Sequence, residues 1–332
     1  QHTKKQQKKR VAFAIENMIP RPPSRLLILF ALFFSICCSA TTAASCDLDL
    51  PLLPASQANP DAIRAACVAG SGCAFIPGSQ IVAPGANLYC NCDNPVHTAE
   101  ISASGMKDGQ LAIASSKFKQ LAINRQTTPF QRFSIAIIDS TVDEIDIRVG
   151  SIDLVIITIE NSTVRTLQVR TQNGGVEAFA VNITNSVIGG DANPLYFFGS
   201  SIYPWYPFQI HTSNVTFISG DKPSLVVVNA RVTNGGSWNK SSCFKFENTR
   251  FELNATLAGT NNVYALDFDG ARFESDPLLL SNVSVKVADS NNDNILLAIA
   301  LRISSMNRTN IRIEDSDFDV RGRVLDLSTF DS

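Results

Sequence analysis

The sequence has little of what catalysis or metal binding usually needs. Only 17% of its 332 residues are charged, and three are histidine. It lacks the Gly-His-Gly and Arg-x-Lys motifs typical of polygalacturonase-like hydrolases, and it has no EF-hand loop, phosphate-binding glycine loop or nucleophile elbow. These absences exclude the sites that such motifs build. We therefore expect no catalytic residue, no metal and no cofactor.

An apolar run near the N-terminus has the form of a secretory signal. Residues 26–38 are almost wholly apolar, Arg21 and Arg25 precede them, and small residues follow. A basic flank, an apolar stretch of ~7–15 residues and a small-residue exit are the parts of a signal peptide, whereas a membrane span needs ~20 residues. We expect cleavage near Ala44, so that the mature chain starts at Ser45; the alternative is a signal anchor that is retained.

Four segments follow from this interpretation. Residues 1–17 are interpreted as an upstream overrun or an incomplete gene model, and residues 18–44 as the signal peptide. We expect residues 45–97 to form a cysteine-rich cap and residues 98–332 a repetitive body, truncated at the C-terminus because it stops inside a strand-like pattern. The expected location is extracellular or at the cell surface, with any membrane anchor outside this sequence.

The charge of the mature chain argues against nucleic acid as a partner. Residues 1–44 hold seven of the 28 basic residues but one of the 30 acidic ones, which leaves 21 basic against 29 acidic residues and a net charge of −8. Nucleic acids and anionic membranes both reward clustered Lys and Arg. The remaining candidates are extracellular glycans and proteins of a host or cell surface.

Cysteines are concentrated at the start of the mature chain, at Cys46, Cys67, Cys73, Cys90 and Cys92. In an exported protein this density predicts a disulfide-stapled cap, although the six mature cysteines allow 15 pairings. The same cap contains the one helix that the mature sequence predicts, over residues 59–67. Asn59 is its capping residue, Pro60 its first position and Gly70 its stop signal.

The body is predicted to be all-β, because short runs rich in Val, Ile, Phe and Thr follow one another without a helical period. A unit recurs in it: an apolar residue, any residue, Asn or Asp, two variable residues and a second apolar residue. Its polar positions are Asp139, Asn161, Asn185, Asn214, Asn248, Gly270, Asn282 and Asp315, at drifting intervals of 12 to 34 residues.

A repeated corner residue with variable insertions predicts a right-handed parallel β-helix, a solenoid in which each coil stacks on the previous one. Asn and Asp tolerate the left-handed backbone of a tight corner, and the apolar residues beside them, such as Phe246 and Phe251, should fill the interior. The alternative is an antiparallel β-sandwich, in which the Asn-Gly pairs within residues 171–175 and 233–236 close hairpins.

Seven N-glycosylation sequons lie in the body, at Asn161, Asn182, Asn214, Asn239, Asn254, Asn282 and Asn307. Three of them coincide with corner positions. If a corner side chain points inward it cannot carry a glycan, so the preferred sites are Asn182, Asn239, Asn254 and Asn307.

Residues 195–208 contain seven aromatic side chains interrupted by Gly and Pro. This composition predicts a poor strand and favours an insertion between coils. If exposed, Tyr203, Trp205 and Tyr206 could stack on sugar rings or anchor a protein partner. If folded back, they would cover an open side of the solenoid instead.

The export signal, the cysteine-bearing start and the repeated NST, NVTF, NTRF and NVSV units resemble the large β-helical surface proteins of kinetoplastid protozoa, including the dispersed gene family type. The resemblance covers residues 98–332. It implies a pectate-lyase-like β-helix, display at a cell surface and an adhesive role. The function expected is therefore a non-enzymatic surface glycoprotein; the alternative is a polysaccharide-active β-helix enzyme, a lyase or glycosidase.

Overall fold

The computed structural model describes residues 61, 63–64, 74–77, 86–90, 93–100, 110–130, 133–171, 176–190, 194–199, 208–220, 223–228, 231–233, 243–254, 263–274, 277–287, 298–307, 310–319 and 325–327. The first eleven strands are β1 (Ala74–Pro77), β2 (Ala86–Cys90), β3 (Asp93–Glu100), β4 (Gln110–Ala114), β5 (Lys117–Phe130), β6 (Phe133–Ile138), β7 (Thr141–Glu160), β8 (Thr163–Thr171), β9 (Val176–Thr184), β10 (Val187–Gly190) and β11 (Leu195–Gly199). The others are β12 (Phe208–Ser219), β13 (Leu225–Val228), β14 (Arg231–Thr233), β15 (Cys243–Leu253), β16 (Val263–Glu274), β17 (Pro277–Ser281), β18 (Ser284–Val287), β19 (Ala298–Asn307), β20 (Asn310–Glu314), β21 (Asp317–Asp319) and β22 (Leu325–Leu327).

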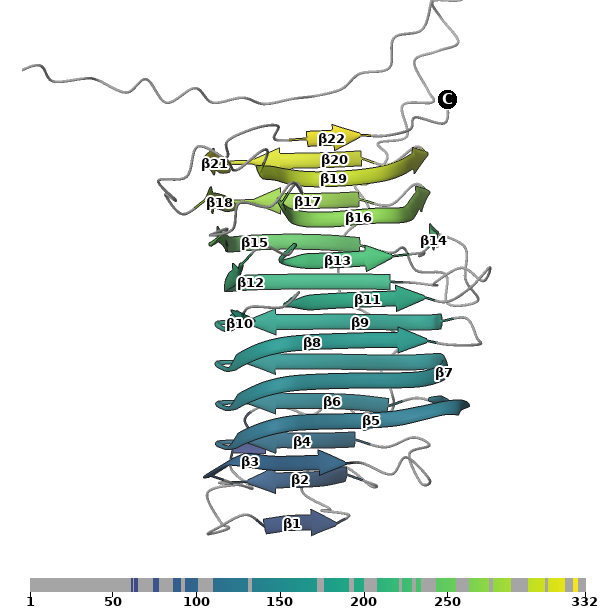
Figure 1. The fold of residues 1–332 in the computed structure, drawn as a ribbon, viewed down its shortest axis with the longest axis vertical. Coiled ribbons are helices and arrows are strands. Elements are labelled where there is room, and N and C mark those ends of the chain that lie inside the picture. The colour runs from purple at the N-terminus through teal and green to yellow at the C-terminus, as the bar shows by residue number, and fades with distance from the viewer. Residues whose placement is uncertain are drawn as a thin grey trace, which may run out of the picture.

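The strands lie in one sheet, stacked along the long axis of the molecule from β1 to β22 (Figure 1). Among the described strand pairs only β1 and β2 are antiparallel, and later strands pair in parallel, as β4 does with β6 and β6 with β7. The structure is thus nearly all β with parallel pairing, as the sequence predicts, and this arrangement is compatible with a solenoid.

The alternative of an antiparallel sandwich is wrong, because the predicted hairpins do not form. The Asn-Gly pair within residues 171–175 separates β8 from β9, yet β8 pairs in parallel with β7, β10 and β11, while β9 pairs in parallel with β7 and β12. The second Asn-Gly pair follows β14, which pairs in parallel with β16. None of β8, β9 and β14 therefore takes part in an antiparallel hairpin among the described strand pairs.

Residues with left-handed backbone conformation recur at the corners between strands, as the sequence predicts. Among the described residues, eight other than glycine have positive φ, between 46° and 56°, and we call them the corner row: Ser115, Asp139, Asn161, Asn185, Asn214, Asn248, Asn282 and Asp315. Seven of the eight are predicted corner positions. Asn and Asp dominate because they tolerate this backbone region at lower cost than other L-residues.

Two corrections make the repeat more regular than the sequence suggested. Gly270 does not belong to the corner row, because the corner that bonds to Asn248 is Asn282, while Gly270 lies in β16, which pairs with β13, β14 and β19. Ser115 is a corner that lacks the expected Asn or Asp. We call the stretch from one corner to the next a layer. Equivalent residues of successive layers are then 24, 22, 24, 29, 34, 34 and 33 positions apart.

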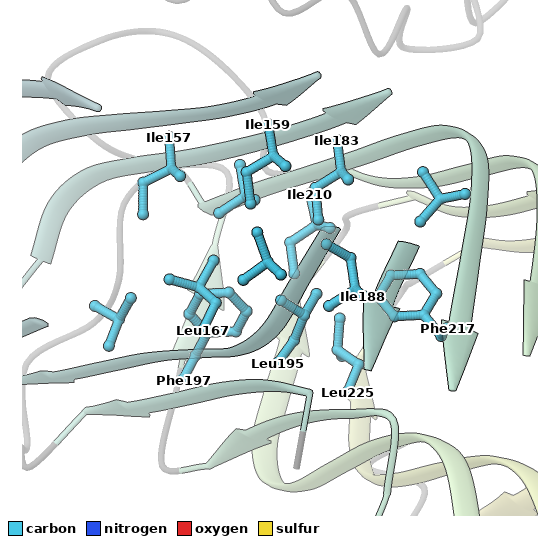
Figure 2. Packing of buried hydrophobic residues seen from close by; sticks show 14 of the residues in the cluster. Ile157, Ile159, Leu167, Ile183, Ile188, Leu195, Phe197, Ile210, Phe217 and Leu225 are labelled. Atoms are coloured by element: carbon cyan, nitrogen blue, oxygen red, sulfur yellow. The ribbon is translucent and has the colours of Figure 1, made fainter. Parts of the chain in front are cut away.

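The apolar residues that flank the corners form interior ladders. One ladder runs through paired positions of successive layers: Val142, Val164, Ile188, Phe217, Phe251, Val285 and Phe318. Phe246 and Phe251 are both fully buried, which confirms their predicted interior position. Figure 2 shows such side chains, Ile159, Ile188 and Phe217 among them, converging from different strands on one apolar core.

A row of buried hydroxyl groups supports the corners from inside. Ser116 and Ser140, each directly after a corner, have side chains that donate to carbonyl oxygens two residues earlier, at 2.6 and 2.7 Å. The backbone N–H of Ser116 donates to Ser140 Oγ, and that of Ser140 to Ser162 Oγ. Buried backbone donors at a turn need such partners. This row was not predicted, although Ser or Thr follows most corners in the sequence.

The corner side chains point outward, so the reason for preferring the sequons away from the corners does not hold. All eight are exposed, and the asparagines are bonded in pairs rather than in one continuous ladder. Asn214 Nδ2 donates to Asn185 Oδ1 at 2.8 Å, and Asn282 Nδ2 to Asn248 Oδ1 at 2.7 Å. Hydrogen bonds between exposed groups compete with water, so the backbone conformation matters more than the side-chain bond.

Replacing Asn248 with Val should therefore lower the free energy of unfolding by about 1–2 kcal/mol, because a β-branched residue is strained at positive φ. Asn248→Gly should cost less, since glycine adopts this conformation freely although it also loses the bond to Asn282. Urea unfolding of the two variants checks this. Equal losses would mean that the side-chain bond, and not the backbone angle, maintains the corner.

In β4, β6 and β7, several side chains that point away from the interior core are also apolar and buried. Ala112, Ala136, Ile138 and Ile156 are at most 7% exposed, and none belongs to the interior core cluster.

Of the helix predicted over residues 59–67, the structure describes positions 61, 63 and 64, which have helical backbone. Ile63 is fully buried, and the rest of the predicted helix lies outside the described residues.

An ion-pair network holds this N-terminal segment at the corner row. Arg64 Nε donates to Asp139 Oδ2 at 2.7 Å, and Arg64 Nη2 donates to Glu160 Oε1 at 2.8 Å. The hydrogen bonds from Arg64 lower the pKa of the Asp139 carboxyl. Residues 61–64 thus lie beside the layer that begins at Asp139, several layers beyond β1. No helix of the described part is long and apolar enough to span a membrane.

Candidate binding face

Alternate residues of β7, β8 and β11 project from the outside of the stack and place polar and aromatic side chains next to one another. Interior positions such as Ile145, Leu167 and Phe197 are fully buried. The residues between them form a surface that we call the outer face: Glu144, Asp146, Arg148, Gln168, Arg170, Tyr196 and Phe198. Parallel register aligns Asp146 with Gln168 and Gln168 with Tyr196.

At the acidic end of the outer face, neighbouring side chains bind the two carboxylates. Asp146 is only 7% exposed, and both of its oxygens contact the Arg148 guanidinium, with Nε–Oδ1 at 3.1 Å and Nη2–Oδ2 at 2.7 Å. This hydrogen bonding raises the pKa of Arg148. Glu144 accepts a hydrogen bond from Gln120 at 3.1 Å. Neighbouring side chains therefore hold both carboxylates in place.

The middle of the outer face is a guanidinium beside an aromatic ring. Arg170 Nη2 donates to Gln168 Oε1 at 2.6 Å, and the carbon at the centre of the guanidinium lies 5.4 Å from the centroid of the Tyr196 ring. This is within the range of a cation–π contact. Arg170 Nε is buried and has no hydrogen-bond partner among the described residues. The arrangement fixes a planar donor next to an aromatic surface.

Two parallel aromatic rings complete the outer face. Tyr196 and Phe198, two positions apart on β11, have ring centroids 6.5 Å apart and planes within 4° of each other. Both side chains are partly exposed. Half-exposed aromatic rings are costly to leave in water and are frequent at sites of protein or carbohydrate contact.

Residues 195–199 were predicted to belong to an insertion, and this is wrong, because they form β11. Leu195 and Phe197 point inward and are fully buried, whereas Tyr196 and Phe198 point outward. The period-two alternation was visible in the sequence but was outweighed by the nearby Gly and Pro. The predicted contact residues Tyr203, Trp205 and Tyr206 lie outside the described residues, in the segment that joins β11 to β12.

The four preferred glycosylation sites differ in how much of each the structure describes. Asn182 is half-exposed within β9, and Asn254 is exposed directly after β15. The backbone of Asn307 ends β19, and Asn239 is outside the described residues. Glycan occupancy at all four remains a prediction.

The cysteine cap is likewise untested. Cys46, Cys67, Cys73 and Cys92 are outside the described residues, and Cys90 is described only through its backbone in β2. The disulfides therefore remain a prediction. In the described part of the chain no group of three or more His, Cys, Asp or Glu side chains could hold a metal ion.

Comparisons with known proteins add no relative. No family model, no curated protein and no solved structure matches this chain.

Proposed function

We propose that the protein is a non-enzymatic, secreted or cell-surface glycoprotein that adheres to its ligands through the outer face of a right-handed parallel β-helix. The single observation that carries the proposal is the partly exposed, parallel ring pair of Tyr196 and Phe198 beside the Arg170 guanidinium. Such a surface offers apolar ring area together with fixed hydrogen-bond donors, which is the combination that extracellular glycans and protein loops require.

The handedness follows from a general rule rather than from a contact. A connection between parallel strands of one sheet is right-handed in about 98% of cases, because right-handed strand twist favours it. Parallel pairing of successive layers therefore supports a right-handed coil. The signal peptide, the cysteine-rich cap and the resemblance to kinetoplastid surface proteins support display outside the cell.

The acidic side chains favour a binding role over catalysis. A glycosidase needs two carboxylates facing one bond, one of them free to exchange a proton. On the outer face Asp146 is bound by Arg148, and Glu144 is bonded to Gln120. Farther along the stack, Asp267 is bound by Arg302 through both carboxylate oxygens. Each of these carboxylates is held by a neighbouring side chain.

The secreted protein should bind an array of immobilised extracellular glycans or intact cells. Tyr196→Ala with Phe198→Ala should reduce that binding about thirtyfold or more, because truncating even one aromatic anchor typically costs about 2 kcal/mol. The matched control is Arg250→Ala with Glu252→Ala, which alters two outward positions of β15, a strand that pairs with β12, β17 and β18 and with none of the strands of the outer face. This control should bind as the parent does.

Two results would contradict the proposal. One is equal binding by both double variants, which would place the contact elsewhere. The other is turnover of a polysaccharide that disappears when Asp146 or Glu144 is replaced by its amide, which would favour the enzyme alternative.

A further inference from the structure

The sequons at the corners follow a regular order that the stack makes visible. From Asp139 onward, every second corner is the asparagine of a sequon, and the corners between them are not. The sequon corners are Asn161, Asn214 and Asn282; the others are Asp139, Asn185, Asn248 and Asp315. Asn185 and Asn248 fail only because Val187 and Arg250 stand where a Ser or Thr is needed.

The three sequon asparagines share one local geometry. Each is exposed, has φ between 48° and 56°, and lies on the same edge of the stack. Each donates its Nδ2–H to the corner of the preceding layer, at 3.2 Å for Asn161, 2.8 Å for Asn214 and 2.7 Å for Asn282. An outward side chain at a tight turn leaves room for a bulky substituent that a strand interior does not.

From this arrangement we infer that Asn161, Asn214 and Asn282 carry N-linked glycans, which form a single row along the corner edge. The inference rests on the proposed function, because it requires entry into the secretory pathway. The donor is an oligosaccharide linked through diphosphate to a lipid. Its anomeric C–O bond breaks, the electron pair leaves with the diphosphate, the anomeric carbon bonds to Nδ2, and Nδ2 releases one proton. The second Nδ2 hydrogen remains able to donate to the preceding corner.

The alternation has a physical consequence. Neighbouring layers of a β-stack are about 4.8 Å apart, so glycans on adjacent corners would be attached about 5 Å from each other. Placing them on every second corner doubles this separation to about 10 Å. The corners without sequons instead supply the acceptors Asp139 Oδ1, Asn185 Oδ1 and Asn248 Oδ1. The outer face that we propose as the binding surface contains no sequon.

Asn182 provides the contrast within the same chain. It lies in the middle of β9, between Thr158 of the preceding layer and His211 of the next, and is only partly exposed. A glycan there would have to displace side chains in both layers. The corner sites should therefore be more fully occupied than Asn182, the reverse of the order expected from the sequence.

The test uses the full chain secreted from a eukaryotic host, with mass-spectrometric mapping of each sequon after enzymatic removal of the glycans. Thr163→Ala, Thr216→Ala and Ser284→Ala abolish the three sequons and leave the corner asparagines intact. Each should remove one glycan and raise the mobility of the protein by one step. Thr163→Ser, which preserves the sequon, should leave the glycan at Asn161 in place.

A gain-of-site variant tests accessibility of the edge directly. Arg250→Thr completes a sequon at Asn248, whose side chain is exposed like those of its neighbours, and should add a glycan there. Secretion with a start near Ser45 and glycans at Asn239, Asn254 or Asn307 but none at any corner would overturn the row and leave the proposed function standing. An unglycosylated chain retained in the cytosol would overturn both.

Discussion

Replacing Phe251 with alanine should lower the free energy of unfolding by about 3–5 kcal/mol, the usual cost of truncating a buried Phe. Phe251 is fully buried at the centre of an interior ladder. Its ring stacks on that of Phe217 in the preceding layer, with centroids 4.8 Å apart and planes within 7°. The centroid of the Phe246 ring, before the Asn248 corner, lies 6.0 Å from that of Phe251. Truncation would thus open a cavity shared by two layers.

Chemical unfolding together with hydrogen exchange should detect this loss. Each layer of a stacked fold contacts only its neighbours, so exchange should rise most in β12, β15 and β18, the strands that contain Phe251 and its ladder partners. The control is Arg250→Ala, at the adjacent position, where 52% of the side chain is exposed. Its effect should stay within about 0.5 kcal/mol. Equal effects of the two substitutions would contradict the interior ladder.

Replacing Arg302 with methionine should be similarly damaging, because it would leave the Asp267 carboxylate buried without its cation. Asp267 is 4% exposed, and its two oxygens accept from Arg302 Nε at 2.7 Å and Nη2 at 2.6 Å. The same guanidinium lies 4.2 Å from the centroid of the Tyr264 ring. Removing one partner of a buried ion pair typically costs about 3–5 kcal/mol.

Two further variants separate the charge from the geometry of this pair. Arg302→Lys preserves the charge but not the two-pronged contact, so it should recover only part of the stability. Asp267→Leu combined with Arg302→Met removes both charges and should be more stable than Arg302→Met alone. Thermal unfolding of the three variants measures the order. If the double variant were the least stable of the three, the attraction between Asp267 and Arg302 would exceed the free-energy cost of removing both charges from water.

Local properties were readable in the sequence. The positive φ of Asn161 and Asn248 was predictable because tolerance of the left-handed region belongs to the residue type. The burial of Phe246 and Phe251 was predictable because strands alternate their faces. The predicted corner at Gly270 was wrong because a short local pattern can also occur by chance, here inside β16.

The sequence by itself therefore determined the strand-rich composition, seven of the eight corners and the interior side of the flanking residues, since each depends on residues a few positions apart. Only the tertiary structure decided that corner asparagines face solvent, that Tyr196 stands beside Arg170, and that Arg64 binds both Asp139 and Glu160. Arg64 lies 75 and 96 positions from those two carboxylates. Contacts at such separations depend on the register in which the layers stack, and layers of unequal length leave no local pattern from which that register can be read.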